Sequence, residues 1–205
     1  MSLINLPIRL FDVLLVAVLA AGLLSGRQHG MSAELLDLAK WLAVLFGSAA
    51  VYQALGRQLA RYTGVFGLLS CYLLAYLGAA LLIFILFALL KRAVGGKLLG
   101  SDIFGRGEYY LGMVSGMARY SCVLLAALAL LNARSFSPLE VRAMREFQKD
   151  QFGADFFPTL RSLQASVFEQ SCIGPWIHRD LGFLLIKPTA PERRQRHLRE
   201  VRPPF

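Results

Sequence analysis

The chain has 205 residues, of which 56% are hydrophobic and only 17% are charged, and its formal net charge is +9 at pH 7. A soluble domain usually carries about 25% charged residues, so this composition excludes an ordinary water-soluble fold. The basic residues flank apolar segments and fill the C-terminal tail, a pattern typical of attraction to anionic lipid, and no nucleic-acid partner is expected. The cysteines are widely separated and form no CxxC or Cys/His cluster, so no zinc site is predicted.

The first predicted membrane span covers Leu10–Gly26 and carries Asp12 near its start. Asp12 has two interpretations: a carboxylate close to the lipid head groups, or a buried partner for a basic residue on another helix. Gly22, Gly26 and Gly30 recur every four residues. This spacing allows either close helix approach or a tight exit into a loop.

Arg27 opens a short polar connection that leads into the second predicted span, Leu35–Leu55. Ser32 is predicted to cap this helix, and Glu34 in its first turn complements the helix dipole. The third predicted span, Val65–Leu90, contains no charged residue. It exceeds the roughly 20 residues needed to cross a hydrocarbon core about 30 Å thick, so it is the clearest membrane helix of the chain.

Glycines are frequent in segment 91–110, which favours a surface loop, with a re-entrant connection as the alternative. The fourth predicted span, Leu111–Leu131, opens with a GxxxG motif formed by Gly112 and Gly116. Arg119 follows one turn later inside the same span. An arginine at this depth must find a carboxylate or carbonyl groups, or extend toward the interface.

Arg119 is predicted to form an ion pair with Asp12 or with Glu108, the two acids that the spans could bring near it. Charge reversal of Arg119 together with its acid should then restore folding or function that either single change removes. The glycine motifs on the first and fourth spans would form the packing seams beside this pair.

Beyond the spans the chain becomes more polar. Ser137-Pro138-Leu139-Glu140 reads as a capping box, and the helices after it are amphipathic and too polar to cross a bilayer. We therefore divide the chain into a four-helix transmembrane domain (1–134), membrane-surface helices (135–187) and a basic disordered tail (188–205). The fold class predicted is all-α, a polytopic membrane protein with about four transmembrane helices plus amphipathic C-terminal helices.

Two stretches together resemble the colicin V production protein family of bacterial inner-membrane proteins, over about residues 8 to 133. That family usually has an acid early in the first span, here Asp12, followed by a loop of the form Gly-x-x-Arg-Gly-aromatic-x-x-Glu. The present chain reads GRQHGMSAE over 26–34. It matches the loop at both glycines and the glutamate, whereas His29 and Met31 replace the arginine and the aromatic residue.

The second shared motif is Asp-Arg-x-x-Gly-x-x-x-Gly-x-x-Arg at the start of the last span. This chain reads EYYLGMVSGMAR over 108–119, so the glycines and Arg119 fit, while Glu108 and Tyr109 replace the Asp-Arg pair. The candidate polar and packing residues are Asp12, Gly22, Gly26, Arg27, Gly30, Glu34, Glu108, Gly112, Gly116 and Arg119.

The resemblance implies a non-enzymatic inner-membrane protein associated with colicin V production or export and envelope homeostasis, acting within a membrane complex. It implies no cofactor. The expected partners are the lipid bilayer, anionic lipid at the basic tail, and other membrane or export proteins or a second copy of the chain. Four spans place both termini on one side, and the basic tail favours the cytoplasm.

A small oligomeric transporter or channel that uses the intramembrane polar residues is the alternative function. An intramembrane enzyme is disfavoured, because the sequence contains no HExxH or GxSxG motif and no paired catalytic aspartates. No enzymatic activity is therefore expected.

Overall fold

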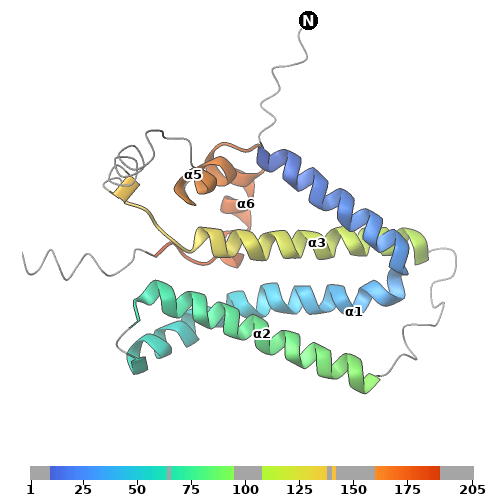
Figure 1. Cartoon of the computed structure of the whole chain (residues 1–205), viewed down its shortest axis with the longest axis horizontal. Helices are drawn as coiled ribbons and strands as arrows, with labels where there is room; N and C mark the ends of the chain where they lie inside the picture. The colour runs from blue at the N-terminus through green and yellow to red at the C-terminus, as the bar shows by residue number, and fades with distance from the viewer. Residues whose placement is uncertain (1–9, 64–65, 95–107, 138–139, 142–159, 190–205) are drawn as a thin grey trace, which may run out of the picture.

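The computed structural model describes residues 10–63, 66–94, 108–137, 140–141 and 160–189. Within these residues the regular secondary structure is helical, apart from one isolated bridge, so the predicted all-α fold is confirmed. The long helices are α1 (Leu10–Thr63), α2 (Leu68–Val94) and α3 (Glu108–Asn132) (Figure 1). In the described residues they contain four segments long and apolar enough to cross a bilayer. The chain is a multi-pass membrane protein.

The observed membrane segments start and end close to the predicted ones. They are Phe11–Gln28, Glu34–Thr63, Leu68–Ala93 and Tyr109–Asn132. The second segment extends well past the predicted end at Leu55, because a single glycine, Gly56, does not stop the helix. That glycine is buried, and the ring of Tyr72 from α2 lies against it.

Helix α1 is continuous in hydrogen bonding but turns back on itself, so it supplies two membrane segments (Figure 1). Segment 27–33 contains no proline, and its backbone remains helical through the bend. The predicted polar connection is therefore part of a helix, and Ser32 does not cap a separate one. One contact requires the bend. Arg119 reaches both Ser25 and Asp37, which a straight helix would hold about 18 Å apart.

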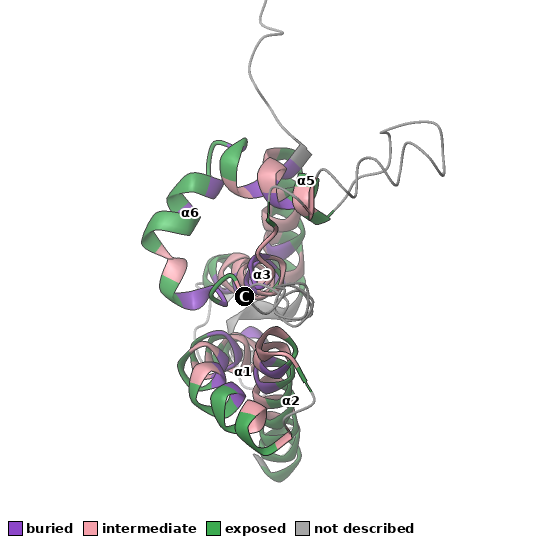
Figure 2. Ribbon diagram, turned by 90° about the vertical axis from the view of Figure 1, so that its left-hand side faces the viewer, coloured by how far each residue is buried: buried purple, intermediate pink, exposed green. Residues whose placement is uncertain are grey.

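Helix α3 occupies the centre of the molecule. Figures 1 and 2 both place it between the pair formed by α2 and the second arm of α1 and the C-terminal helices. Its buried side includes small residues, Ser115, Gly116 and Ala129 among them. Small side chains let neighbouring backbones approach closely, which is the main source of helix attraction where lipid and protein are equally apolar.

The C-terminal elements pack against the end of α3. They are α5 (Leu160–Gln164), the π-helical turn η2 (Ala165–Glu169), α6 (Gly174–Asp180) and the 3₁₀ turn η3 (Gly182–Leu184). Gln164 is buried, and its Nε2 donates to the carbonyl oxygens of Leu131 at 2.6 Å and Arg134 at 2.9 Å. The last carbonyls of a helix lack partners within the helix, so Gln164 caps α3 from outside.

Residues 184–186 enter the bundle instead of lying on its surface. Leu184 packs in one cluster with Leu45 of α1 and Cys122 of α3, which lie in the middle parts of their membrane segments. Leu185 and Ile186 are also buried, and Ile186 accepts a hydrogen bond from Asn132 at 3.1 Å. The predicted surface helices of 135–187 thus include a stretch that belongs to the core of the transmembrane bundle.

The predicted capping box is confirmed at Ser137 and Glu140. The Ser137 N–H donates to the Glu140 carboxylate at 3.2 Å, and the Glu140 N–H donates to Ser137 Oγ at 3.3 Å. The rest of the helix that this box opens lies outside the described residues. So do most of the glycine-rich segment 91–110 and the tail from residue 190.

The cap formed by Gln164 predicts a measurable loss of stability. Gln164→Ala leaves the carbonyl oxygen of Leu131 in α3 and that of Arg134 just after it without their partly buried donor, which should lower the free energy of unfolding by about 1–3 kcal/mol. Gln58→Ala on the exposed surface of α1 is the matched control and should change it little. Denaturant titration in micelles measures both, and equal stability of the two variants would contradict the role of Gln164.

Candidate functional site

Four glycines bring the first arm of α1 into backbone contact with α3. A Cβ atom on Gly22 would lie 2.9 Å from the carbonyl oxygen of Gly116, and one on Gly26 would overlap the carbonyl of Gly112. A Cβ on Gly116 would in turn overlap the carbonyl of Gly22. The seam is therefore reciprocal: each helix offers bare backbone to the other, the geometry that small-xxx-small motifs permit.

Arg119 lies one turn after Gly116 and points into the bend of α1. Its Nη1 is 2.7 Å from Glu34 Oε2 and 3.6 Å from Asp37 Oδ2, while its Nη2 donates to Ser25 Oγ at 2.9 Å. Glu34 is 1% exposed and the Arg119 side chain 15%. One guanidinium thus joins both arms of α1 to α3, using the planar fork of donors that lysine lacks.

Lys40 extends this cluster toward α2. Its Nζ lies 2.8 Å from Asp37 Oδ1 and 5.6 Å from the centre of the Phe84 ring. We call Ser25, Glu34, Asp37, Lys40 and Arg119 the arginine junction. Its two acids and two bases carry no net charge, which limits the cost of placing them beside hydrocarbon.

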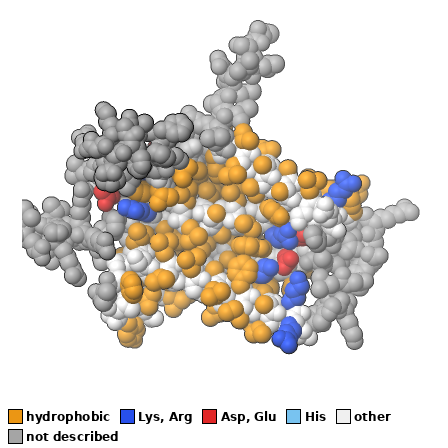
Figure 3. Space-filling view, viewed as in Figure 1, with side chains coloured by type: hydrophobic (Ala, Val, Ile, Leu, Met, Phe, Trp, Pro, Cys, Tyr) orange, Lys and Arg blue, Asp and Glu red, His pale blue; other side chains and the backbone are white. Residues whose placement is uncertain are grey.

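The junction lies at the end of the bundle where α1 bends. Figure 3 shows basic and acidic side chains gathered at this end, while apolar side chains cover the middle of the same face. Arg27 lies there as well, with its guanidinium 5.2 Å from the centre of the Tyr109 ring. Arginine above an aromatic ring is typical of membrane interfaces, where Tyr and Trp residues concentrate.

The predicted partner of Arg119 needs correction. Arg119 pairs with Glu34 and Asp37, and not with Asp12; the side chain of Glu108 lies outside the described residues. Asp12 lies beside the C-terminal segment, where its Oδ2 accepts a hydrogen bond from the Cys172 N–H at 3.4 Å. Glu34 and Asp37 are three residues apart, so they lie on the same face of a helix. This spacing was the signal in the sequence that both acids could face one base.

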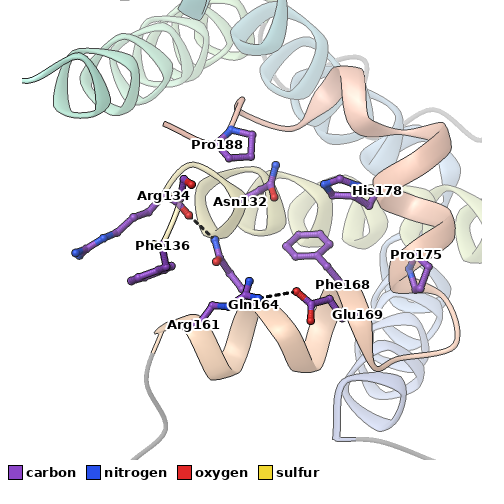
Figure 4. Close-up of a pocket in the computed structure, with 11 residues that line it drawn as sticks. Asn132, Arg134, Phe136, Arg161, Gln164, Phe168, Glu169, Pro175, His178 and Pro188 are labelled. Atoms are coloured by element: carbon purple, nitrogen blue, oxygen red, sulfur yellow. Dashed lines mark hydrogen bonds and ion pairs between the residues drawn. The ribbon is translucent and has the colours of Figure 1, made fainter. Parts of the chain in front are cut away.

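Sequence reasoning missed a cavity of about 410 Å³ at the opposite end of α3 (Figure 4). Arg161 pairs with Glu169 at 2.9 Å along the wall formed by α5 and η2, and His178 packs edge-on against Phe168. Arg134 lies on its rim, with the guanidinium 4.7 Å from the centre of the Phe136 ring. No group of three potential metal ligands occurs in the described part of the chain. The cavity thus presents paired charges beside aromatic rings.

No protein family, curated protein or solved structure matches this chain. The resemblance to colicin V production proteins rests on the two sequence motifs alone. What the geometry adds is that residues of both motifs meet, since Gly26 contacts Gly112 and Glu34 pairs with Arg119.

The arginine junction predicts strong coupling between Glu34 and Arg119. Glu34→Gln or Arg119→Gln leaves one buried charge without its partner and should cost about 3–5 kcal/mol of unfolding free energy. The double variant should cost less than the sum of the two, because neither charge is then isolated. Denaturant titration in micelles completes the double-mutant cycle.

Arg161→Gln is the control for that cycle. Arg161 also forms an ion pair, but with side chains 41% and 56% exposed, so its loss should cost about 0–1 kcal/mol. If Arg119→Gln proves as mild as Arg161→Gln, the junction does not hold the bundle together.

The glycine seam predicts a contrast between two alanine variants. Gly26→Ala places a methyl group against backbone of α3 that cannot move aside, and overpacking of this kind costs about 1–3 kcal/mol. Gly78→Ala in α2 meets nothing within 4 Å and should be neutral or stabilising, because alanine favours helix. Thermal unfolding of both variants in micelles tests the contrast, and matching values would exclude a tight seam.

Proposed function

We propose that this protein is a non-enzymatic component of the bacterial inner membrane, of the kind associated with colicin V production or export and envelope homeostasis. The observation that carries the proposal is the meeting of the two motifs. Residues 26–34 and 108–119 supply most of the glycine seam and the Glu34–Arg119 pair, so residues of the two motifs form one physical unit, while Asp12 lies apart from it beside Cys172.

A structural role for this unit is supported by its ion pairs, because its acids and bases bind one another. Glu34 and Asp37 are both within ion-pair distance of Arg119, and Asp37 also binds Lys40. General acid or base catalysis needs a group that can exchange a proton with a substrate. Groups engaged with one another in this way are suited to holding helices, which favours a scaffold or helper within a membrane complex over an enzyme.

The proposed setting follows from the arrangement of the spans. Four membrane segments return the chain to the side on which it started, and the basic tail favours the anionic cytoplasmic leaflet. We therefore place both termini in the cytoplasm, with the tail near anionic lipid and the helices available to other membrane or export proteins.

Complementation tests the role. In a bacterium that makes colicin V and lacks its own protein of this type, the chain should restore the zone of growth inhibition around the colony. Arg119→Gln should restore it less, because the junction is broken, whereas Arg161→Gln should act as the wild type. A tagged wild-type chain that accumulates in the membrane without restoring inhibition would exclude the proposal.

A small transporter or channel is the second candidate, and Asp12 is the observation that favours it. Its Oδ1 atom is buried and has no hydrogen-bond partner in the structure, as a carboxylate on an ion pathway could be. Ion flux into proteoliposomes that disappears with Asp12→Asn would support transport. Reconstituted protein without flux would leave the scaffold role in place.

A further inference from the structure

One exposed ion pair on α6 is out of place for a lipid-facing surface. Arg179 and Asp180 form a two-pronged pair, with Nε–Oδ1 and Nη2–Oδ2 distances of 3.1 Å each. Their side chains are 77% and 40% exposed. Trp176 and Phe183, which flank the pair in sequence, are 52% and 66% exposed.

Neighbouring contacts place this pair at the depth of the membrane segments. Leu181, the next residue, packs in the cluster that includes Leu125 and Ala126 of α3. Ala126 is only about 10 Å along α3 from Arg119 of the arginine junction. The end of α6 that carries the ion pair is therefore about two helical turns from the junction along the bundle axis.

The uncharged stretch of α2 indicates how thick the hydrocarbon layer around the bundle is, measured from the level of the arginine junction. Lys40 of the junction lies 5.6 Å from the centre of the Phe84 ring, so the junction is level with the second half of α2, whose apolar part ends at Lys91. From there back to Leu68 the helix carries no charge for about 34 Å, slightly more than the thickness of a bilayer core. A bilayer that covers this stretch also covers the level of Arg179 and Asp180. Charged side chains that face acyl chains are costly, so they are rare on the lipid-facing surface of membrane proteins.

We propose that the α6 face is an interface with a second copy of this chain within the membrane, in which Arg179 of each copy pairs with Asp180 of the other. Adjacent opposite charges are self-complementary under two-fold symmetry, the commonest symmetry of homo-oligomers. The pair would then face protein, and the exposed Trp176 and Phe183 would pack beside it. Between Leu74 and Leu90 the exposed residues of α2 are all leucine, isoleucine, alanine or glycine, Leu82 and Leu86 among them, and this side suits lipid.

Two variants with opposite charge changes, studied first separately and then together, test the pairing between copies. In lipid nanodiscs the wild type should be a dimer by single-molecule mass measurement. Arg179→Asp alone places like acids across the interface, and Asp180→Arg alone places like bases there. Each variant should weaken self-association by about tenfold or more. When the two variants are co-expressed with different tags, the acidic face meets the basic one, and the tags should purify together.

Controls separate this interface from folding and from other surfaces. Both substituted side chains are well exposed, so circular dichroism of each variant should match the wild type. Leu82→Ala and Leu86→Ala on α2 should leave the dimer intact. A monomeric wild type, dimers of either single variant, or failure of the mixed variants to associate would overturn the proposal. With the exposed Cys172 replaced by serine, labelling of Phe183→Cys by a membrane-impermeant thiol reagent would also overturn it, because the face would then line water.

Discussion

A single guanidinium in the bend of α1 connects three of the four membrane segments of the bundle, the two arms of α1 and α3. Arg119 of α3 contacts Ser25 on the first arm of α1 and Glu34 on the second, with Glu34 almost fully buried. A buried ion pair gains little stability over an apolar pair of the same shape, but it is costly to break once formed. It therefore specifies one arrangement of the arms over others that would bury the same apolar area.

The bilayer explains why the fold depends on such specific contacts. Lipid is as apolar as leucine, so burying leucine side chains between helices gains little, and association depends on close packing and on polar links. The glycine seam provides the first and the arginine junction the second, side by side on α3. At the other end of α3, Gln164 and the bridge between Arg134 and Thr189 tie the C-terminal segment to the bundle.

The bundle has two unlike sides. The α2 side is apolar over the full thickness of a membrane, whereas the α6 side presents the Arg179–Asp180 pair and aromatic residues at membrane depth. A protein with one lipid-like side and one polar side is suited to assembly within the membrane. This asymmetry agrees with a scaffold role in a complex, because such a role needs a surface that protein covers better than lipid does.

The sequence by itself determined the membrane character of the chain, the approximate limits of its spans and the capping box at Ser137. These features depend on local hydropathy, glycine spacing and side chains three residues apart, all of which can be read along one segment. It also identified Arg119 as a residue in need of a partner. It could not identify the partner, because Glu34 reaches Arg119 only through the bend of α1. The tertiary structure alone decided that bend, the burial of residues 184–186 and the exposure of Arg179. Each of these depends on how separate helices pack, and a periodic pattern within one helix carries no information about the angle it makes with the next.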